Sequence, residues 1–427
     1  MTGQSDKQVA VRTIVWFAFA LVCLIPNVCS GQSPDQELRW WKGNLHTHSL
    51  WSDGDQFPEM IADWYRERDY HFLALTDHNV LSEGDRWMSL QKIIGRSDEG
   101  VLQRYRDRFG DAWVETRGKQ ENDSIEVRLK PLNEFRYLLE ERNQFILIPA
   151  EEISDKAEGK PVHINATNLA EAIAPAGGAT VREAMQNNLR AILEHEHAHG
   201  LEVLPHLNHP NFHYAITAED LAAVTMEHFY EVYNGHPGVN HLGDADHPSV
   251  ERIWDLVNAI RRTQVDVPPL MGIATDDSHE YHGEKGSRPG RGWVMVRSRF
   301  LTPEHLIRAM KKGDFYASSG VTLKDVSFDA DTRTLDIEVD PAPNASYRID
   351  FVVTRSDNDS KAASLKQENI GIIAATVDAD QASYTMKEHD LYVRAVITSS
   401  LDHVDPSFDG QKKQAWTQPV GWQTESR

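Results

Sequence analysis

Cysteine is almost absent from this chain. Only two of its 427 residues are cysteines, Cys23 and Cys29, and both precede Ser30. Disulfide bonds and cysteine metal ligands are therefore excluded from the rest of the protein. Any metal ion must be bound there by imidazole and carboxylate groups.

Basic charge is also scarce. The chain has 44 Lys and Arg against 65 Asp and Glu, a formal net charge of −21 at pH 7. Such a chain is not expected to bind duplex nucleic acid or an anionic membrane surface. Apolar residues make up 40% and charged residues 26%, which is typical of a folded globular protein.

No hydrophobic run near the N-terminus is long enough to span a bilayer comfortably. The run Ile14–Ile25 follows Lys7 and Arg12 and precedes the small residue Ser30. Its length fits the core of a signal peptide better than a membrane span. We therefore predict a signal peptide over residues 1–30 and an exported protein, periplasmic or extracellular. The alternative is an uncleaved segment, through which alone the protein would contact a membrane.

Short apolar runs that end in metal-ligand residues recur up to about residue 320. Phe72–Leu75 leads to Asp77 and His78, and Leu270–Ala274 leads to Asp277. Helix-type stretches such as Val181–His199 separate these runs. Alternating strands and helices predict a parallel sheet or barrel, whose strand ends carry the chemistry. The seven runs begin at Trp40, Phe72, Phe145, Pro161, Leu201, His228 and Leu270.

The pattern changes near Gly320. Before it, residues 31–320 predict the barrel, with a polar insertion at about 85–143 and a loop at Ala170–Thr180. After it, apolar residues alternate, as at Tyr347, Ile349, Phe351 and Val353. This period of two predicts that residues 321–427 form a small antiparallel β-sandwich.

Histidine is concentrated in the predicted barrel. All but three of the 20 His lie between His46 and His282. His46 and His48 alternate along one strand, so both side chains can reach the same ion. One ion takes three or four protein ligands, so a set of nine indicates two or three ions. The predicted ligands are His46, His48, Asp53, His78, Glu152, His163, His209, Asp277 and His279.

These motifs together resemble those of the PHP superfamily, the polymerase and histidinol phosphatase group. The similar segments are residues 44–54, 75–79, 149–154, 208–211 and 277–279, with Ala150 where glycine is usual. Residues 230–235, residues 315–320 and the ending at Ala415-Trp416 are similar to a secreted branch related to a carbamate-cleaving (carbaryl) esterase.

The resemblance implies a fold and a metal centre. The fold would be a distorted (β/α)7 TIM-like barrel with a di- or trinuclear centre of Mn, Fe or Zn. Glu152 would bridge two ions. Glu151 and Asp276 offer a second acidic choice beside Glu152 and Asp277, and His206 is an alternative to His209.

The implied activity is that of an exported, metal-dependent hydrolase. We expect a phosphoesterase in which a metal-bridging hydroxide attacks a small anionic or ester substrate. Glu152, His209 and His279 are the predicted catalytic residues. Lys285, Arg288 and Arg291 lie in a glycine-rich loop and are predicted to bind a phosphate or carboxylate, unless the loop is simply solvated.

Three other functions stay open. The same metal site could hydrolyse a carboxyl ester or carbamate. His195-Glu196-His197-Ala198-His199 matches the H-E-x-x-H pattern of zinc metalloproteases, although Gly200 ends the helix directly afterwards. The third alternative is a metal-binding protein without catalytic activity.

Overall fold

The computed structural model describes residues 1–3, 37–119, 124–356 and 365–422. Leu38–Arg427 form one compact unit. Apart from its first three residues, the predicted signal peptide lies outside the described residues. Among the residues that are described, no helix combines the length and apolar character needed to cross a membrane.

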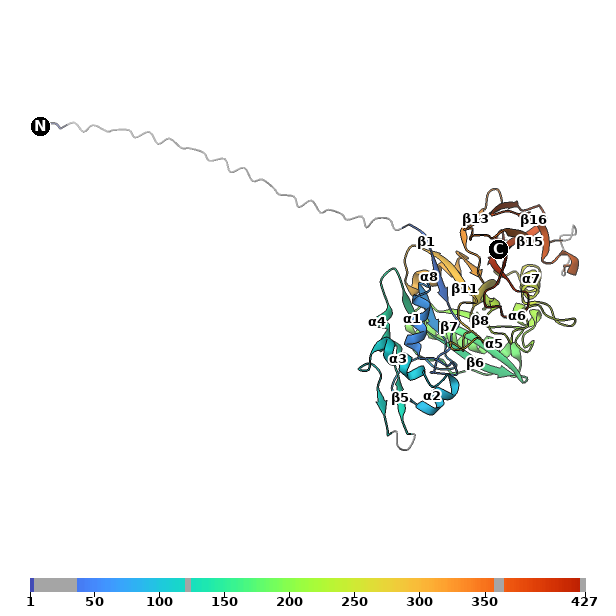
Figure 1. The fold of residues 1–427 in the computed structure, drawn as a ribbon. Helices are drawn as coiled ribbons and strands as arrows, with labels where there is room; N and C mark the ends of the chain where they lie inside the picture. Colours follow the sequence, from blue (N-terminus) through green and yellow to red (C-terminus); the bar gives the residue numbers. More distant parts are fainter. Residues whose placement is uncertain (4–36, 120–123, 357–364, 423–427) are drawn as a thin grey trace. The chain divides into compact units, whose positions relative to one another are not determined.

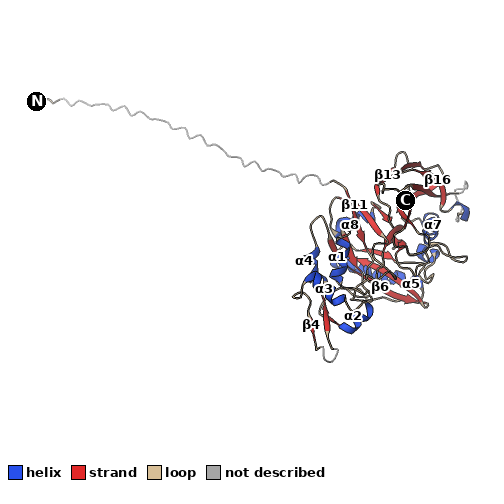
Figure 2. Ribbon diagram, viewed as in Figure 1, coloured by secondary structure: helices blue, strands red, loops and turns tan. Residues whose placement is uncertain are grey.

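A mixed sheet runs through the compact unit (Figures 1 and 2). Within the described residues it has 13 strands, in the order β10-β9-β8-β7-β6-β2-β1-β11-β12-β19-β18-β15-β16. The strands of the seven predicted apolar runs form the first half of this order. They are β1 (Arg39–Asn44), β2 (Phe72–Leu75), β6 (Ile146–Ala157), β7 (Lys160–Thr167), β8 (Leu204–Leu207), β9 (Phe229–Asn234) and β10 (Met271–Thr275).

The predicted all-parallel arrangement is wrong at β7. β1, β2 and β6 are parallel, as are β8, β9 and β10, but β7 runs antiparallel to both of its neighbours. The cause is the tight turn at Glu158 and Gly159, whose φ angles of 54° and 75° suit a two-residue hairpin. β6 and β7 therefore form an antiparallel hairpin instead of the predicted parallel pair.

The predicted barrel is also not closed. β11 (Trp293–Ser298) pairs antiparallel with β1 and continues the sheet toward β12, whereas β10 lies at the far end of the strand order. In the described part of the chain no strand ladder joins β10 to β11. The fold is a mixed α/β arrangement with an open large sheet.

Helices cover the large sheet (Figure 2). The longest is α5 (Val181–His199), which begins where the Thr180 hydroxyl accepts from the Glu183 amide and ends at Gly200, with φ of 63°. Its Ile192 side chain is buried in the same core as Ile164 of β7. The other helices here are α1 (Pro58–Arg66), α6 (Ala218–Ala223), α7 (Val250–Ile260), the π-helical turn η2 (Arg261–Val265) and α8 (Pro303–Lys311).

The polar stretch predicted as an insertion has a small core of its own. Its strands β3 (Arg86–Ser89), β5 (Glu126–Leu129) and β4 (Thr116–Arg117) form a three-stranded antiparallel sheet. Its helices are α2 (Leu90–Arg96), α3 (Val101–Phe109) and α4 (Leu132–Leu139). This core also takes in Trp51 and Phe57, which flank Asp53 in the loop after β1. The insertion therefore supports a loop of the predicted metal site.

The C-terminal region has two antiparallel layers that share a core. One layer, β12 (Phe315–Ser318), β19 (Lys412–Thr417), β18 (Asp390–Asp402), β15 (Tyr347–Arg355) and β16 (Ile372–Asp378), continues the large sheet. The other is β13 (Leu323–Asp329), β14 (Thr334–Val339) and β17 (Gln381–Thr385); the turn η3 (Gln367–Asn369) precedes β16. Ile337 of β14 and Phe351 of β15 are buried in the same cluster. The predicted alternation thus places one face of β15 in a sandwich core.

Candidate metal centre

A cluster of imidazoles and carboxylates lies where the strands of the first half-sheet end. His46 and His48 follow β1, His78 follows β2, and Asp277 and His279 follow β10. The hairpin supplies Glu152 from β6 and His163 from β7. His209 follows β8, and Asp53 lies in the loop after β1. The structure therefore brings all nine predicted ligands together.

Glu152 lies at the centre of this cluster and is 1% exposed. Its Oε1 lies 3.0 Å from Nδ1 of His163, 3.5 Å from Nε2 of His46 and 3.7 Å from Nε2 of His209. Its Oε2 lies 2.6 Å from Nδ1 of His78 and 3.6 Å from Nε2 of His48. One carboxylate thus faces five imidazoles, with a different set on each oxygen, as a bridging ligand requires.

Two further carboxylates complete the cluster. Oδ1 of Asp277 lies 3.2 Å from Nε2 of both His46 and His48. Asp53 is half exposed, and its oxygens lie 3.3 Å from Nε2 of His78 and 3.5 Å from Nε2 of His279. The cluster is therefore buried at Asp277 and opens toward solvent at Asp53.

Several ring nitrogens in this cluster face a carboxylate oxygen without a well-aligned hydrogen bond. Among the described residues, Nε2 of His46, Nε2 of His48 and Nδ1 of His163 are buried with these carboxylate contacts alone, at 3.0 to 3.6 Å. Buried nitrogens that lack a good hydrogen bond are costly unless another partner, such as a metal ion, takes the lone pair. The groups His48/Asp53/His78/His279, His46/His48/Glu152 and His78/Glu152/His163 each keep their ligand atoms within 4.8 Å of one another. The residues fit divalent metal ions bound by nitrogen and oxygen.

The protonation states suit metal ligands. Burial acts to raise the pKa of Glu152 and Asp277, but the surrounding imidazoles outweigh it and hold both pKa values well below the usual range. Burial and the nearby His279 lower the pKa of His48 to about 3. Burial acts to lower the pKa of His46 and His78, but the nearby carboxylates outweigh it and raise both. The carboxylates and His48 are thus in the form that binds metal, whereas a metal ion would displace protons from His46 and His78.

Two ligand-bearing residues have unusual backbones. His209 has a φ of 24° and Asp277 a φ of 48°, both in the left-handed region that non-glycine residues rarely adopt. Such conformations persist where the surrounding structure holds them, and they gather at functional sites. Here they turn the chain directly after β8 and β10, where the ligands are needed.

Two buried polar residues, Glu231 and Asn208, support the predicted ligands, and the sequence analysis gave them no role. Glu231 of β9 accepts from Nδ1 of His46 at 2.7 Å, from the Thr275 hydroxyl at 2.6 Å and from Asn234 at 2.7 Å. Asn208 donates to Oε1 of Glu152 at 2.7 Å. The available signal was the 230–235 segment, which resembled the family but was given no chemical role.

The neighbouring acidic residues are used elsewhere. Glu151 accepts from the amide of Ile173 at 2.5 Å, and burial raises its pKa to about 7. Asp276 accepts from the Tyr65 hydroxyl and from the amides of Gly290, Arg291 and Gly292. The structure therefore places Glu152 and Asp277, rather than their neighbours, in the cluster.

His206 lies behind the ligands. It is buried, and its Nε2 is 3.6 Å from Oε1 of Glu231, which also accepts from His46. His209 is the one of the two that lies beside Glu152.

The predicted substrate-binding loop faces the C-terminal region. The Arg291 guanidinium is buried and donates to both oxygens of Asp405 and to the carbonyls of Gly235 and Gly286. Arg288 also pairs with Asp405, at 3.4 Å, whereas Lys285 is exposed. Protein partners thus occupy the Arg291 donors, and substrate contact by this loop stays a prediction.

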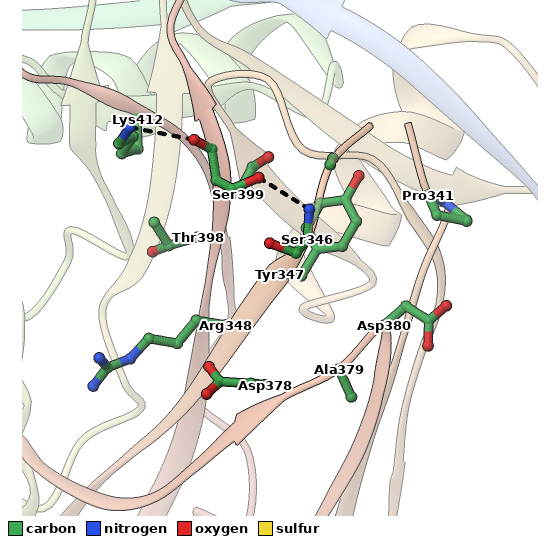
Figure 3. A pocket seen from close by; sticks show the side chains of 12 residues that line it. Pro341, Ser346, Tyr347, Arg348, Asp378, Ala379, Asp380, Thr398, Ser399 and Lys412 are labelled. Carbon is green, nitrogen blue, oxygen red and sulfur yellow. Dashed lines mark hydrogen bonds between the residues drawn. The ribbon is translucent and has the colours of Figure 1, made fainter. Parts of the chain in front are cut away.

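The C-terminal region has a surface pocket of its own, of about 640 Å³ (Figure 3). Both charge signs line it, with Arg348 and Lys412 beside Asp378 and Asp380. It shares no residue with the metal-ligand cluster.

No family model and no curated protein matches this chain. Three solved bacterial structures show a loose likeness to it. A two-domain protein containing a predicted PHP-like metal-dependent phosphoesterase, from Bacteroides vulgatus, is 17% identical over 90% of this chain and 97% of its own, with a TM-score of 0.38. A candidate metal-dependent phosphoesterase from Bifidobacterium adolescentis is 12% identical over 59% and 94%, with a TM-score of 0.30. An amidohydrolase from Chromobacterium violaceum, with bound sulfate and no metal, is 14% identical over 58% and 90%, with a TM-score of 0.28.

Proposed function

We propose that this protein is an exported, metal-dependent hydrolase that cleaves ester bonds and prefers phosphoesters. The observation that carries the proposal is the buried cluster in which ring nitrogens of His46, His48 and His163, which form no well-aligned hydrogen bond, surround Glu152 and Asp277. Two or three divalent ions, Mn, Fe or Zn, fit this donor set. When bound, such ions activate water at neutral pH and offset the negative charge of the transition state.

The residues of the chain have separate roles in this proposal. Glu152 would hold two of the ions, because its two oxygens face different imidazoles. Glu231 orients His46 from behind, through Nδ1. His279 donates from Nδ1 to the Asp277 carbonyl at 2.9 Å, which leaves its Nε2 free to face Asp53.

Nε2 of His209 faces Glu152 at 3.7 Å, so this ring would bind a metal ion. Burial acts to lower its pKa, but the nearby carboxylates of Glu152, Asp277 and Glu231 raise it above the ordinary value of 6.5. A metal ion would replace the proton at this nitrogen, so His209 acts as a ligand and not as the proton donor to the leaving group.

A carboxyl ester or carbamate is the second candidate substrate. Phosphate recognition was expected from Arg288 and Arg291, but both pair with Asp405. A neutral ester needs no such cation, since the ions themselves would polarise its carbonyl group.

The test begins with metal analysis of the purified protein. We expect two to three equivalents of Mn, Fe or Zn, and loss of activity after chelation that added metal restores. A panel of nitrophenyl phosphomonoester, phosphodiester, carboxyl ester and carbamate substrates then identifies the bond that is cleaved.

The control is the pair of histidine variants His48→Ala and His199→Ala. We expect the first to lose activity and the second to retain it, because only His48 faces Asp277 and Glu152. A chelator-insensitive activity, or a cleaved peptide substrate that depends on His199, would overturn the proposal.

A further inference from the structure

A second group of ligand-type side chains lies away from the metal-ligand cluster, at the end of α5. His195 and His199 are four residues apart on one face of this helix, and their ring centroids are 4.4 Å apart. Glu171 comes from the loop that precedes α5, and its Oε1 lies 3.3 Å from Nε2 of His199. One ligand atom from each of the three lies within 4.8 Å of the others.

The two histidines differ in their surroundings. His195 is 7% exposed, and its Nε2 accepts a hydrogen bond from the amide of Ala170 at 3.1 Å. A neutral imidazole has one free lone pair, so an ion bound at Nε2 would take the place of this hydrogen bond and would hold the ring to the same loop through Glu171. His199 and Glu171 are more exposed, so a hydrated ion can reach the group.

We propose that Glu171, His195 and His199 form a separate site for one zinc-class divalent ion, which ties the loop Ala170–Thr180 to the end of α5. Two imidazoles and a carboxylate are a common donor set for such an ion, with water completing the coordination. The loop is already attached to β6, because the Ile173 amide donates to Glu151 and the Gly177 amide donates to Asp155. The Ala176 amide and the Gly177 carbonyl are also hydrogen-bonded to Asn188 and Asn187 of α5, and a bound ion would add to these attachments.

This site is structural rather than proteolytic. In an H-E-x-x-H protease the glutamate between the two histidines acts as the base. Here the carboxylate of Glu196 accepts from the amide of Val203 at 3.2 Å and lies 3.6 Å from Nζ of Lys311. It is engaged with the chain that follows α5 and takes no part in the group.

The test counts bound zinc and measures the mobility of the loop. The full chain is dialysed against buffered free Zn²⁺, and bound zinc is measured for the wild type, His199→Gln, Glu171→Gln and His197→Gln. His197 is the matched control, because it is exposed on the same turn but does not belong to the group. Amide hydrogen exchange of residues 170–180 is followed with and without Zn²⁺.

We expect the wild type and His197→Gln to bind one more ion than His199→Gln, and Glu171→Gln to bind that ion roughly tenfold more weakly or worse. Zinc slows exchange in the loop in the first two proteins only. A His48→Ala variant keeps this ion and this protection, which separates the site from the proposed catalytic centre. Equal zinc content and equal loop exchange in the wild type and His199→Gln, with the fold intact, would overturn the proposal.

Discussion

The carboxylate of Glu231 accepts a hydrogen bond from Nδ1 of His46 at 2.7 Å. Because a carboxylate only accepts, Nδ1 carries the proton, which leaves Nε2 as the nitrogen that can bind a metal ion. That Nε2 lies 3.2 Å from Asp277 and 3.5 Å from Glu152. Glu231 therefore selects the tautomer of His46 that can bind a metal ion.

Replacing Glu231 should weaken metal binding without removing a ligand. We expect Glu231→Gln to lower the affinity for Mn²⁺ or Zn²⁺ roughly 10–100-fold, because the ring is no longer held in one orientation by a charged acceptor. Metal titration measures the effect directly. Unchanged affinity in a variant that folds normally would show that the 2.7 Å contact does not orient His46.

The adjacent acids Glu151 and Glu152 offer an internal comparison. Glu152→Gln removes the shared carboxylate, so we expect lost metal ions and a fall in hydrolysis of at least roughly a hundredfold. Glu151→Gln should leave both unchanged, since a glutamine oxygen can still accept from the Ile173 amide. Metal content and turnover are measured side by side; equal losses in the two variants would contradict the assignment.

The clustering of the proposed ligand residues could be predicted because their spacing follows the strands. His46 and His48 alternate after β1, and Asp277 follows the buried strand β10. In each case the sequence shows an apolar run that ends in residues able to bind a metal ion. The hydrophobic alternation at Ile349 and Phe351 similarly indicated the C-terminal β-layer.

The direction of β7 and the hydrogen bonds of Glu231 could not be predicted from the sequence in the same way. A period of two gives a strand but not its direction, and the turn at Glu158-Gly159 was the only local signal of a hairpin. Glu231 lies inside a fully buried strand, so its partners come from residues distant in sequence. Arg291 was expected to face substrate because nothing in the sequence pairs it with Asp405, more than a hundred residues away.

The contact between Arg291 and Asp405 should contribute to stability. Asp405→Asn leaves the buried guanidinium with a weaker partner, and we expect a loss of about 1–2 kcal/mol in the free energy of unfolding. Asp402→Asn is the control: its ion pair with Lys412 is exposed and should change stability by less than about 0.5 kcal/mol. Urea unfolding of both variants makes the comparison. Equal urea midpoints for the wild type and Asp405→Asn would mean that Asp405 does not stabilise the loop that carries Arg291.

Glu227 should make stability depend on pH. It is 1% exposed, and burial raises its pKa from the ordinary 4.5 to about 7, against the opposing effect of the amides of Phe229 and His228. Between these values the folded state holds a proton that the unfolded state has released, so stability falls as pH rises from about 4.5 to about 7. The slope is about 1.4 kcal/mol per pH unit, or about 3 kcal/mol across the window.

Glu227→Gln removes this titration while keeping an oxygen that can accept from the same two amides, at 2.8 Å each. We expect the variant to match the wild type near pH 4.5 and to exceed it by roughly 2–3 kcal/mol at pH 8, because the wild type then buries a charge. Urea unfolding at the two pH values measures the difference. A constant difference between the proteins at both pH values would show that the carboxyl of Glu227 does not titrate in this range.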